Sequence, residues 1–293
     1  MQVSYGSHGV VRLVDGTQLD CQYRRQVGRP CCGDTVTIQR LDESSGVVEL
    51  VHPRRNQFLR ADPQQRQHIV AANLDQVLIV IAPRPLPSRD LLERYLVAVH
   101  SLDIEPLIVL NKVDLTASDA TEEDAALVAR LEHYRALGYA VVKTSCKAKP
   151  GLQALSPLLG GKTSILVGQS GVGKSSLVRM LLPDLEIQIG ALSRVTGKGT
   201  HTTTTTTLYT LSGSGYLMDS PGVWEFGLWK LDDADLAEGF IEFRPFLSRC
   251  RFNDCLHQSE PGCAIKAAVE RGDIADWRHQ AYLRLLEQNA EGY

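Results

Sequence analysis

Residues 163–182 read TSILVGQSGVGKSSLVRMLL, and this stretch decides the fold of the central part of the chain. Its first five residues predict a buried strand, and the apolar spacing after Lys174 predicts a helix. The turn between them matches the phosphate-binding pattern G-x-x-x-x-G-K-[ST], whose glycines let backbone N–H groups approach a phosphate. Lys174 is expected to reach the β- and γ-phosphates, and the Ser175 hydroxyl to bind Mg²⁺. The predicted phosphate loop comprises Gly168, Gln169, Ser170, Gly171, Val172, Gly173, Lys174, Ser175 and Ser176.

Strands and helices alternate on the N-terminal side of this loop. Continuous apolar runs at 75–83, 106–110 and 139–143 predict strands buried on both faces. Apolar residues at helical spacing in 88–102 and 121–138 predict two helices. Such alternation is typical of a mostly parallel sheet with right-handed crossovers. We therefore expect one α/β domain over residues 64–225.

The tetrapeptide at 111–114, NKVD, follows one of these strands and has the composition of a guanine-recognition loop. Asp114 can accept hydrogen bonds from guanine N1–H and the 2-amino group, and such a matched polar pair discriminates strongly against adenine. Asn111 would tie neighbouring loops together, and Lys112 would lie over the base. The alternative is a strand-end turn that Asp114 caps. With the companion loop TSCK at 144–147, the predicted base-binding residues are Asn111, Lys112, Val113, Asp114, Ser145 and Cys146.

Residues 219–222, DSPG, follow the apolar strand pattern GYLMD. Asp219 would hold Mg²⁺ through water, and the Gly222 N–H would meet the γ-phosphate; an isolated type I turn is the alternative. Together these segments resemble a guanine-nucleotide hydrolase in a rearranged order, since both base loops precede the phosphate loop. This order is a circular permutation. It can leave the site unchanged, because chain termini lie at the surface and can be rejoined elsewhere.

The first sixty residues predict a separate all-β region. Short alternating segments at 10–16, 18–25, 34–41 and 46–53 favour a small OB-fold barrel over residues 1–63. Residues 61–73 then predict a link to the α/β domain. Arginines and aromatic residues of this region form either an RNA surface or solvated strand edges. They are Arg24, Arg25, Arg29, Arg54, Arg55, Arg60, Tyr5, Tyr23 and Phe58.

After residue 225 the sequence predicts a mostly helical region that is too small to build a good core unaided. Cys250, Cys255, His257 and Cys263 fall within fourteen residues. Three sulfurs and one imidazole form a closed ligand set for one structural zinc ion. Buried free thiols beside a surface histidine are the alternative. We expect a zinc-binding domain over residues 226–293.

Composition restricts the classes of function. The chain has 293 residues, of which 43% are hydrophobic, and a net charge of −3, so about two or three domains are expected. The acidic balance gives no independent indication of nucleic-acid binding. No apolar run is long enough for a membrane span, and residues 1–16 lack the pattern of a secretory signal. With an odd count of seven cysteines, we expect a protein of the reducing cytoplasm.

The chain resembles the RsgA (YjeQ) family of small ribosomal subunit biogenesis GTPases. The features that carry the resemblance are the permuted order, DSPGVWEFGLW at 219–229, GKGTHTTT at 197–204, the leading β-region and the cysteine-rich tail. It covers essentially the whole chain and implies an OB-fold, a permuted GTPase domain and a zinc-binding domain. It also implies docking on the 30S subunit and its 16S rRNA late in assembly, beside other late assembly factors. A monomer is the simplest expectation.

The same resemblance implies a first switch at the run of threonines. One hydroxyl among Thr202, Thr203 and Thr204 would complete the Mg²⁺ shell, and Thr203 is our choice. Val223 stands where many GTPases place a glutamine that orients the attacking water. His201 is the family-consistent catalytic substitute; a solvent-exposed loop histidine is the alternative.

The expected function is therefore hydrolysis of GTP to GDP and phosphate, stimulated by the 30S subunit, followed by dissociation. The first competitor is a nucleotide-gated regulatory switch on RNA with negligible hydrolysis, which Val223 favours. The second is a permuted GTPase for large-subunit assembly. We further expect that the segment 219–227 connects the nucleotide state to the orientation of the zinc-binding domain, since loss of the γ-phosphate releases such loops.

Overall fold

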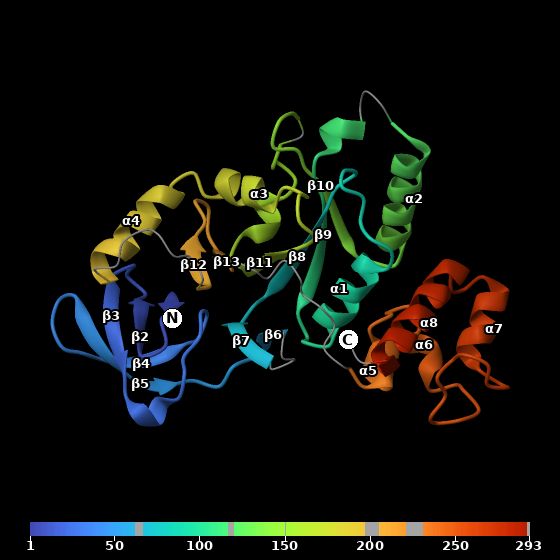
Figure 1. The fold of residues 1–293 in the computed structure, drawn as a ribbon, viewed down its shortest axis with the longest axis horizontal. Helices are drawn as coiled ribbons and strands as arrows, with labels where there is room; N and C mark the ends of the chain where they lie inside the picture. The colour runs from blue at the N-terminus through green and yellow to red at the C-terminus, as the bar shows by residue number, and fades with distance from the viewer. Residues whose placement is uncertain (62–66, 117–119, 150, 197–204, 221–230, 292–293) are drawn as a thin grey trace.

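The computed structural model describes residues 1–61, 67–116, 120–149, 151–196, 205–220 and 231–291. Figure 1 shows three regions: the N-terminal strands, a central sheet with its helices, and a group of C-terminal helices. Among the described helices, none is long and apolar enough to cross a membrane. The predicted boundaries at residues 63 and 225 fall outside the described ranges and stay predictions.

The central region is the α/β domain that the sequence predicts. Five parallel strands lie in the order β10-β9-β8-β11-β13, and β12 pairs antiparallel with β13. Helices α1, α2 and α3 connect or follow these strands. Their bounds are β8 (Gln76–Ile81), α1 (Leu91–His100), β9 (Glu105–Leu110), α2 (Glu122–Ala136), β10 (Ala140–Lys143), β11 (Thr163–Val167), α3 (Lys174–Leu181), β12 (Thr207–Thr210) and β13 (Tyr216–Asp219).

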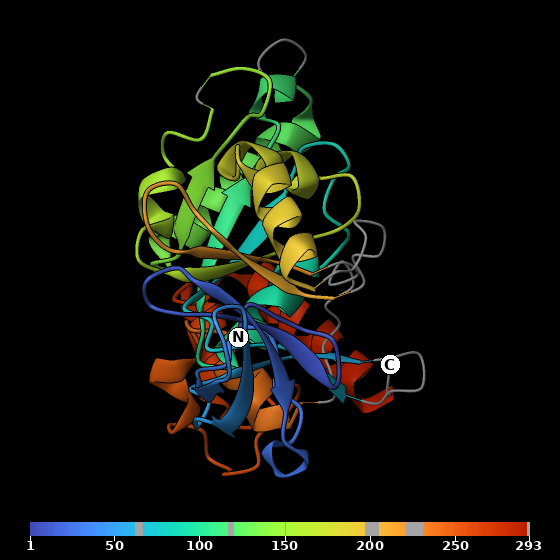
Figure 2. The ribbon, with the colours of Figure 1, turned by 90° about the vertical axis from the view of Figure 1, so that its left-hand side faces the viewer.

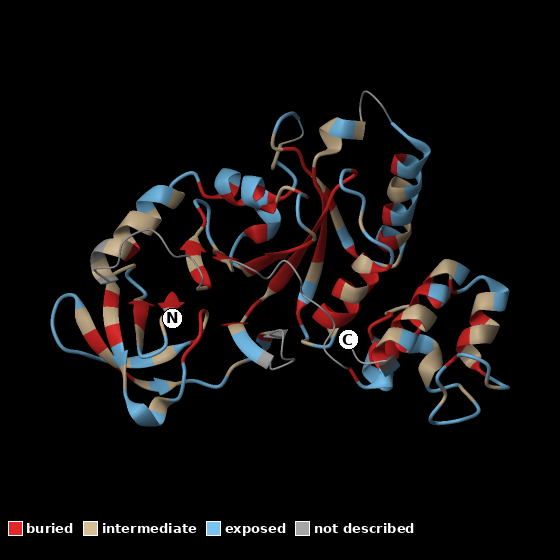
Figure 3. Ribbon diagram, viewed as in Figure 1, coloured by how far each residue is buried: buried red, intermediate tan, exposed pale blue. Residues whose placement is uncertain are grey.

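The strand β8 is buried along its whole length, as its continuous apolar run predicts. Its side chains alternate between two cores. Val77, Ile79 and Ile81 belong to the core shared with α1, α2 and the C-terminal helices, whereas Leu78 and Val80 belong to the core shared with α3. The central strands are accordingly the most continuously buried part of the ribbon in Figure 3. This sheet therefore provides a rigid platform for the loops at its edge.

The N-terminal strands have the order β1-β2-β3-β5-β4, in which β3 runs parallel to β5 and the other pairs are antiparallel. They enclose a small core of their own, formed by Met1, Val11, Leu19, Cys21 and Val48. β1 also pairs with β12, so eleven strands form one continuous sheet. The bounds are β1 (Val3–Ser4), β2 (His8–Arg12), β3 (Gln18–Tyr23), β4 (Val36–Arg40) and β5 (Ser45–Val51).

Two elements differ from the sequence prediction. The predicted link at 61–73 is wrong, because β6 (Gln57–Ala61) and β7 (Gln67–Ala72) pair antiparallel as a two-stranded sheet. Their buried residues Phe58 and Ala71 join the core shared with α1. A further helix, α4 (Leu185–Thr196), precedes the threonines and was not predicted. It packs on β2 and β3, and Figures 1 and 2 both show it beside the N-terminal strands.

The described C-terminal region consists of helices, of which α5 and α8 pack on α1. The helices are α5 (Asp233–Glu238), α6 (Arg244–Leu247), α7 (Ala264–Arg271) and α8 (Asp276–Glu291). Phe240, Phe243, Tyr282 and Leu285 are buried in the same core as Tyr95 of α1. The region therefore completes its core against the central domain, as its small size predicts.

Candidate functional site

The predicted phosphate loop joins β11 to α3 and depends on two glycines. Gly168 has φ of 141° and Gly173 has φ of 96°, a conformation that side chains other than glycine rarely adopt. A Cβ at Gly168 would collide with the Val80 carbonyl oxygen, and a Cβ at Gly173 would collide with Asn111 Nδ2. The loop is thus fitted closely against its neighbours at both ends.

Lys174 opens α3 and is buried by the loop that precedes it. Its Nζ donates to the carbonyl oxygens of Gly168 at 2.5 Å and Gln169 at 2.6 Å. Burial lowers the pKa of the Lys174 ammonium to about 8. A phosphate group would compensate the desolvated charge, which is the role predicted for this lysine.

Asn111 and Lys112 connect the predicted base loop to the phosphate loop. Asn111 Nδ2 donates to the Val172 carbonyl at 2.9 Å, and its Oδ1 accepts from the Thr144 hydroxyl at 3.1 Å. Lys112 Nζ donates to the Gly171 carbonyl at 2.5 Å. Two segments about sixty residues apart along the chain are therefore fixed side by side, with the base loop first in the sequence.

Asp114 lies beside the second predicted base loop. The Ser145 hydroxyl donates to Asp114 Oδ1 at 2.5 Å and accepts from the backbone N–H groups of Lys147 and Ala148. This arrangement orients the carboxylate of Asp114. Burial, followed by the charge of Asp114, raises the pKa of the Cys146 thiol, which keeps it protonated and argues against a nucleophilic role.

Asp219 ends β13, the strand beside β11, so it lies at the same sheet edge as the phosphate loop. Burial raises the pKa of its carboxyl. Within the described ranges no cation or hydrogen-bond donor pairs with this carboxylate. A half-buried acidic group without a partner is suited to a cation site, and this supports the predicted role near Mg²⁺. Next to it, the Thr206 hydroxyl donates to Ser220 Oγ at 2.8 Å.

Several predicted residues lie outside the described part of the chain. These are the catalytic candidate His201, the Mg²⁺ candidates Thr202, Thr203 and Thr204, and the γ-phosphate candidate Gly222 with Val223. Residues 221–227 of the segment expected to connect the nucleotide state to the zinc-binding domain also lie there. Their assignments stay predictions.

No sequence pattern indicates the second loop that contacts the phosphate loop. The Gln169 side chain donates to the carbonyls of Leu86 at 2.8 Å and Pro85 at 3.3 Å, and accepts from the Ser88 N–H at 3.2 Å. The Arg84 carbonyl accepts from Lys112 Nζ at 3.0 Å. Residues 84–88 therefore contact both nucleotide loops, and they lead directly into α1.

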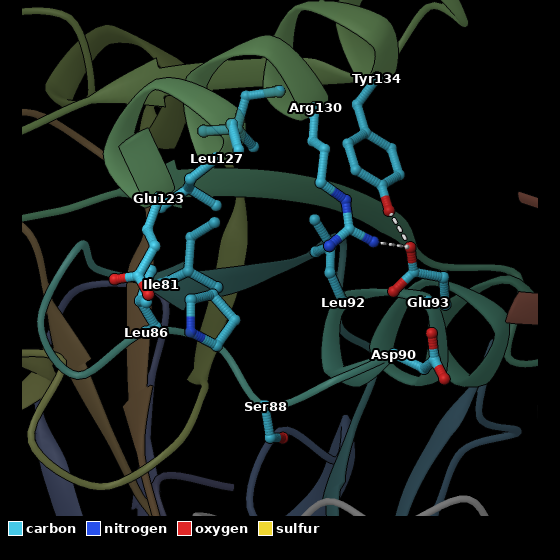
Figure 4. Close-up of a pocket in the computed structure, with 13 residues that line it drawn as sticks. Ile81, Leu86, Ser88, Asp90, Leu92, Glu93, Glu123, Leu127, Arg130 and Tyr134 are labelled. Atoms are coloured by element: carbon cyan, nitrogen blue, oxygen red, sulfur yellow. Dashed lines mark hydrogen bonds and ion pairs between the residues drawn. The ribbon is translucent and has the colours of Figure 1, made fainter. Parts of the chain in front are cut away.

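A cavity of about 240 Å³ lies between this loop, α1 and α2, and Figure 4 shows the side chains that line it. Its wall is mostly apolar, and Glu93 lies at its inner end. The Glu93 carboxylate accepts from the Tyr134 hydroxyl at 2.5 Å and pairs with Arg130 at 3.5 Å and Arg278 at 3.6 Å. This carboxylate is thus already paired. None of the residues that line the cavity belongs to the phosphate loop or to the base loops.

The cysteine–histidine cluster forms as predicted. Cys250, Cys255, His257 and Cys263 each offer one ligand atom, and these atoms lie within 4.8 Å of one another. His257 Nδ1 is 3.6 Å from Cys250 Sγ and 3.4 Å from Cys263 Sγ. Zinc bonds of about 2.3 Å to sulfur and 2.0 Å to nitrogen at tetrahedral angles separate these atoms by about 3.5 Å. The cluster is compatible with a zinc site.

Neighbouring groups fix the histidine of this cluster. His279 Nε2 is 2.8 Å from the His257 carbonyl oxygen, and the Tyr282 hydroxyl donates to the Leu256 carbonyl at 3.0 Å. Both come from α8. Cys263 is the N-cap residue of α7, where its sulfur accepts from the Lys266 N–H. The ligands are therefore held by helix ends and by α8.

The predicted RNA surface of the N-terminal region is only partly exposed. Arg54 donates to Asp34 with both Nε and Nη2, at 2.7 and 2.8 Å, and Phe58 is fully buried. Arg54 is therefore engaged in an ion pair within the N-terminal region, and Phe58 is part of the core. Arg25 and Arg29 are exposed.

Two further arginines of this set are exposed but already paired: Arg24 with Glu49 at 2.8 Å and Arg55 with Asp75 at 2.8 Å. Surface ion pairs of this kind contribute little to stability. Tyr23 donates its hydroxyl to Ser4 Oγ at 3.0 Å, so it is engaged within the strands.

Comparison with known proteins decides the family. The family description RsgA GTPase matches residues 51–229. The chain belongs to the RsgA GTPase family. A relative from Chromohalobacter salexigens, named small ribosomal subunit biogenesis GTPase RsgA, is 47% identical over 267 residues, which are 91% of this chain and 77% of the relative. A relative of the same name from Hahella chejuensis is 45% identical over 98% of this chain and 83% of its own.

Two solved structures share this fold. YjeQ from Thermotoga maritima aligns with a TM-score of 0.81 at 32% identity, over 99% of this chain and 97% of its own. YloQ, described as a circularly permuted GTPase, aligns with a TM-score of 0.79 at 27% identity, over 99% and 94% of the two chains. The predicted circular permutation is confirmed, and the chain is a GTP hydrolase with a large mixed sheet.

Proposed function

We propose that this GTPase acts in late maturation of the 30S ribosomal subunit. It binds the immature subunit and its 16S rRNA, hydrolyses GTP faster when docked, and then dissociates. The names of its relatives support the partner, and the contact of Asn111 with Val172 carries the nucleotide assignment, because it joins base loop to phosphate loop. We also propose a cytoplasmic monomer that meets other late assembly factors on the subunit.

The base loops bind the guanine of the nucleotide, and the phosphate loop binds its phosphates. Asp114, oriented by Ser145, accepts from guanine N1–H and the 2-amino group, while Lys112 covers the base. The backbone of 168–173 and the Lys174 ammonium bind the phosphates at the N-terminus of α3. The 84–88 loop supports this site through Gln169. Hydrolysis then depends mainly on positioning and on stabilising charge at the γ-phosphate.

Mg²⁺ bound with GTP would neutralise developing charge on the phosphate oxygens. Ser175 would hold it directly, and Asp219 would hold it through water. Thr203 would complete its shell, and His201 would orient the attacking water. The unpaired, half-buried carboxylate of Asp219 is the feature of the described residues that favours this arrangement.

The N-terminal strands form an OB-fold over residues 1–63, followed by the GTPase domain at 64–225 and the zinc-binding domain at 226–293. The order β1-β2-β3-β5-β4 supports this fold, because it is a five-stranded Greek key. The barrel is partly closed by the Met1 amino group, which donates to the Asp34 carbonyl at 2.6 Å, and by the Gly33 N–H, which donates to the Met1 carbonyl. Arg25 and Arg29 offer phosphate contacts for RNA.

One zinc ion bound by the cluster stabilises the C-terminal helices. Purified protein is expected to contain about one zinc ion per chain. Cys263→Ser should abolish retention of the metal, whereas Cys146→Ser should retain it, since Cys146 lies outside the cluster. Retention of zinc by the Cys263→Ser variant would contradict the assignment.

The partner is tested by GTP turnover with and without purified 30S and 50S subunits at moderate salt. Stimulation by 30S alone is expected, and His201→Ala should then remove most of it. Stimulation by 50S alone would favour large-subunit assembly. Tight GTP binding without stimulation by either subunit would favour a binding switch.

A further inference from the structure

Two other segments of the chain, β1 and the side chain of Gln188, contact the outer edge of β12. On its inner side β12 pairs with β13, and Thr207 lies opposite Asp219. On its outer side β1 contributes one pair, Val3 opposite Thr207. The Leu208 N–H donates to the Gln2 carbonyl at 2.9 Å, and Gln2 Nε2 donates to the Leu208 carbonyl at 3.1 Å. β1 is only two residues long, so the far end of β12 extends past it.

At that far end the side chain of Gln188 takes the place of a strand. The Thr210 N–H donates to Gln188 Oε1 at 3.0 Å, and Gln188 Nε2 donates to the Thr210 carbonyl at 3.1 Å. One amide thus satisfies both main-chain groups of one residue, as a residue of an antiparallel neighbour would. The Arg12 guanidinium also donates to Thr210 Oγ1. The edge of β12 is therefore completed partly by backbone and partly by Gln188.

These contacts along the outer edge of β12 hold the strand that pairs with Asp219. β12 has four residues, and its neighbour on the side away from β13 is the two-residue β1, so few backbone hydrogen bonds hold its outer edge. An unpaired edge strand also shifts register more easily. Gln188 comes from α4, which packs on β2 and β3, so its amide connects β12 to an element that does not depend on the hairpin. The register of Thr207 against Asp219 is held from outside the nucleotide site.

We propose that Gln188 is a positioning residue for GTP hydrolysis. By pairing with both main-chain groups of Thr210 it completes the outer edge of β12 beyond β1, and so keeps Asp219 where it acts on the magnesium shell. The inference rests on the role of Asp219 given above. It does not depend on the ribosomal partner, because it concerns the turnover of the chain alone.

The test compares Gln188→Ala with the parent in GTP turnover without subunits. Loss of two neutral hydrogen bonds should lower kcat about three- to tenfold. KM for GTP and affinity for GDP should stay unchanged, because the phosphate and base loops are untouched. Glu186→Ala, an exposed neighbour on the same helix, is the matched control and should equal the parent. Unchanged kcat in Gln188→Ala, or an equal loss of GDP affinity, would overturn the proposal.

Gln188→Glu provides a readout that general destabilisation would not give. An ionised carboxylate repels the Thr210 carbonyl, whereas the protonated acid can donate to that carbonyl and accept from the Thr210 N–H. Its kcat relative to the parent should therefore rise as the pH is lowered from about 8 to about 5.5, because the carbonyl raises the carboxyl pKa. A constant ratio over this range would contradict the pairing.

Asp219→Ala separates the two levels of the inference. If Asp219→Ala turns GTP over normally, the magnesium assignment fails and the proposal fails with it. If Asp219→Ala is slow while Gln188→Ala is normal, the assignment stands and only the positioning role fails. Slow turnover in both, with GDP affinity retained in Gln188→Ala, supports the proposal.

Discussion

The two flanking regions attach to the GTPase sheet in different ways. The N-terminal strands join through the backbone, since β1 pairs with β12 and the sheet continues without a break. The C-terminal helices join through buried charged side chains. Arg278 is 1% exposed and pairs across the junction with Glu93 of α1 at 3.6 Å, and Arg284 donates to Asp90 at 2.6 and 2.7 Å.

This difference predicts different sensitivity to substitution. Backbone hydrogen bonds persist whatever side chain a residue carries, so the N-terminal junction should tolerate most single changes. A buried ion pair fails when one partner is removed, because the other charge stays buried without compensation. The C-terminal junction should therefore respond strongly to one substitution.

The largest effect is expected for Arg278→Ala. This arginine pairs with Glu242 and Glu93, and its guanidinium lies 4.5 Å from the centre of the Phe240 ring. Its removal takes from the buried Glu242 carboxylate its described cation and leaves Glu93 with Arg130 and Tyr134, so the free energy of unfolding measured in urea should fall by about 3–5 kcal/mol. Arg271→Ala, which removes an exposed pair with Asp273, should cost less than about 1 kcal/mol. Similar losses in both variants would contradict the contrast.

A backbone-level change is needed to disturb the N-terminal junction comparably. A Cβ at Gly9 would collide with the Tyr23 hydroxyl and the Val3 carbonyl oxygen. Gly9→Ala should push β1 from β2 and lower the free energy of unfolding by about 1–3 kcal/mol. Faster amide exchange at β1 and β12 would locate the damage. The control is Gly213→Ala, where a Cβ meets nothing within 4 Å; an equal loss there would refute the mechanism.

The side-chain junction should also respond to pH through His100, at the end of α1. Burial, then the charges of Arg244 and Arg278, lowers the pKa of His100 to about 4. The unfolded chain binds more protons between this value and about 6.5, so stability should fall by about 1–2 kcal/mol from pH 7 to pH 5. In urea titrations His100→Gln should lose less over this range. Any loss of zinc at low pH would affect the parent and the His100→Gln variant equally. An identical pH dependence of stability in the two proteins would therefore exclude His100 as the cause.

The smallest effect is expected for Gln2→Ala. The Gln2 side chain donates to the Leu208 carbonyl and accepts from Gln18 Nε2, but its main-chain carbonyl still accepts from the Leu208 N–H. Urea unfolding should therefore show a loss of about 1 kcal/mol. A loss as large as that of Arg278→Ala would mean that the N-terminal junction also depends on side chains.

Residues that are close along the chain could be recognised from the sequence. The phosphate loop, the tetrapeptide ending at Asp114 and the four zinc ligands are each short segments whose spacing carries the chemistry. Their order alone predicted the permutation, and the strand–helix alternation predicted the sheet. α4 also has a helical signal, since Leu185, Ile189 and Leu192 recur at helical spacing, although it was not predicted.

The sequence by itself thus determined the chemistry, because each motif is a local run of residues with a fixed role. Only the tertiary structure decided which side chains support it. Gln169 donates to a loop about eighty residues away in the sequence. Gln188 of α4 completes the edge of β12. Arg278 is buried where distant segments of the chain meet. Phe58, expected either on an RNA surface or among solvated strand edges, lies in the core. No local pattern distinguishes these residues from exposed ones, because their burial depends on how distant segments pack.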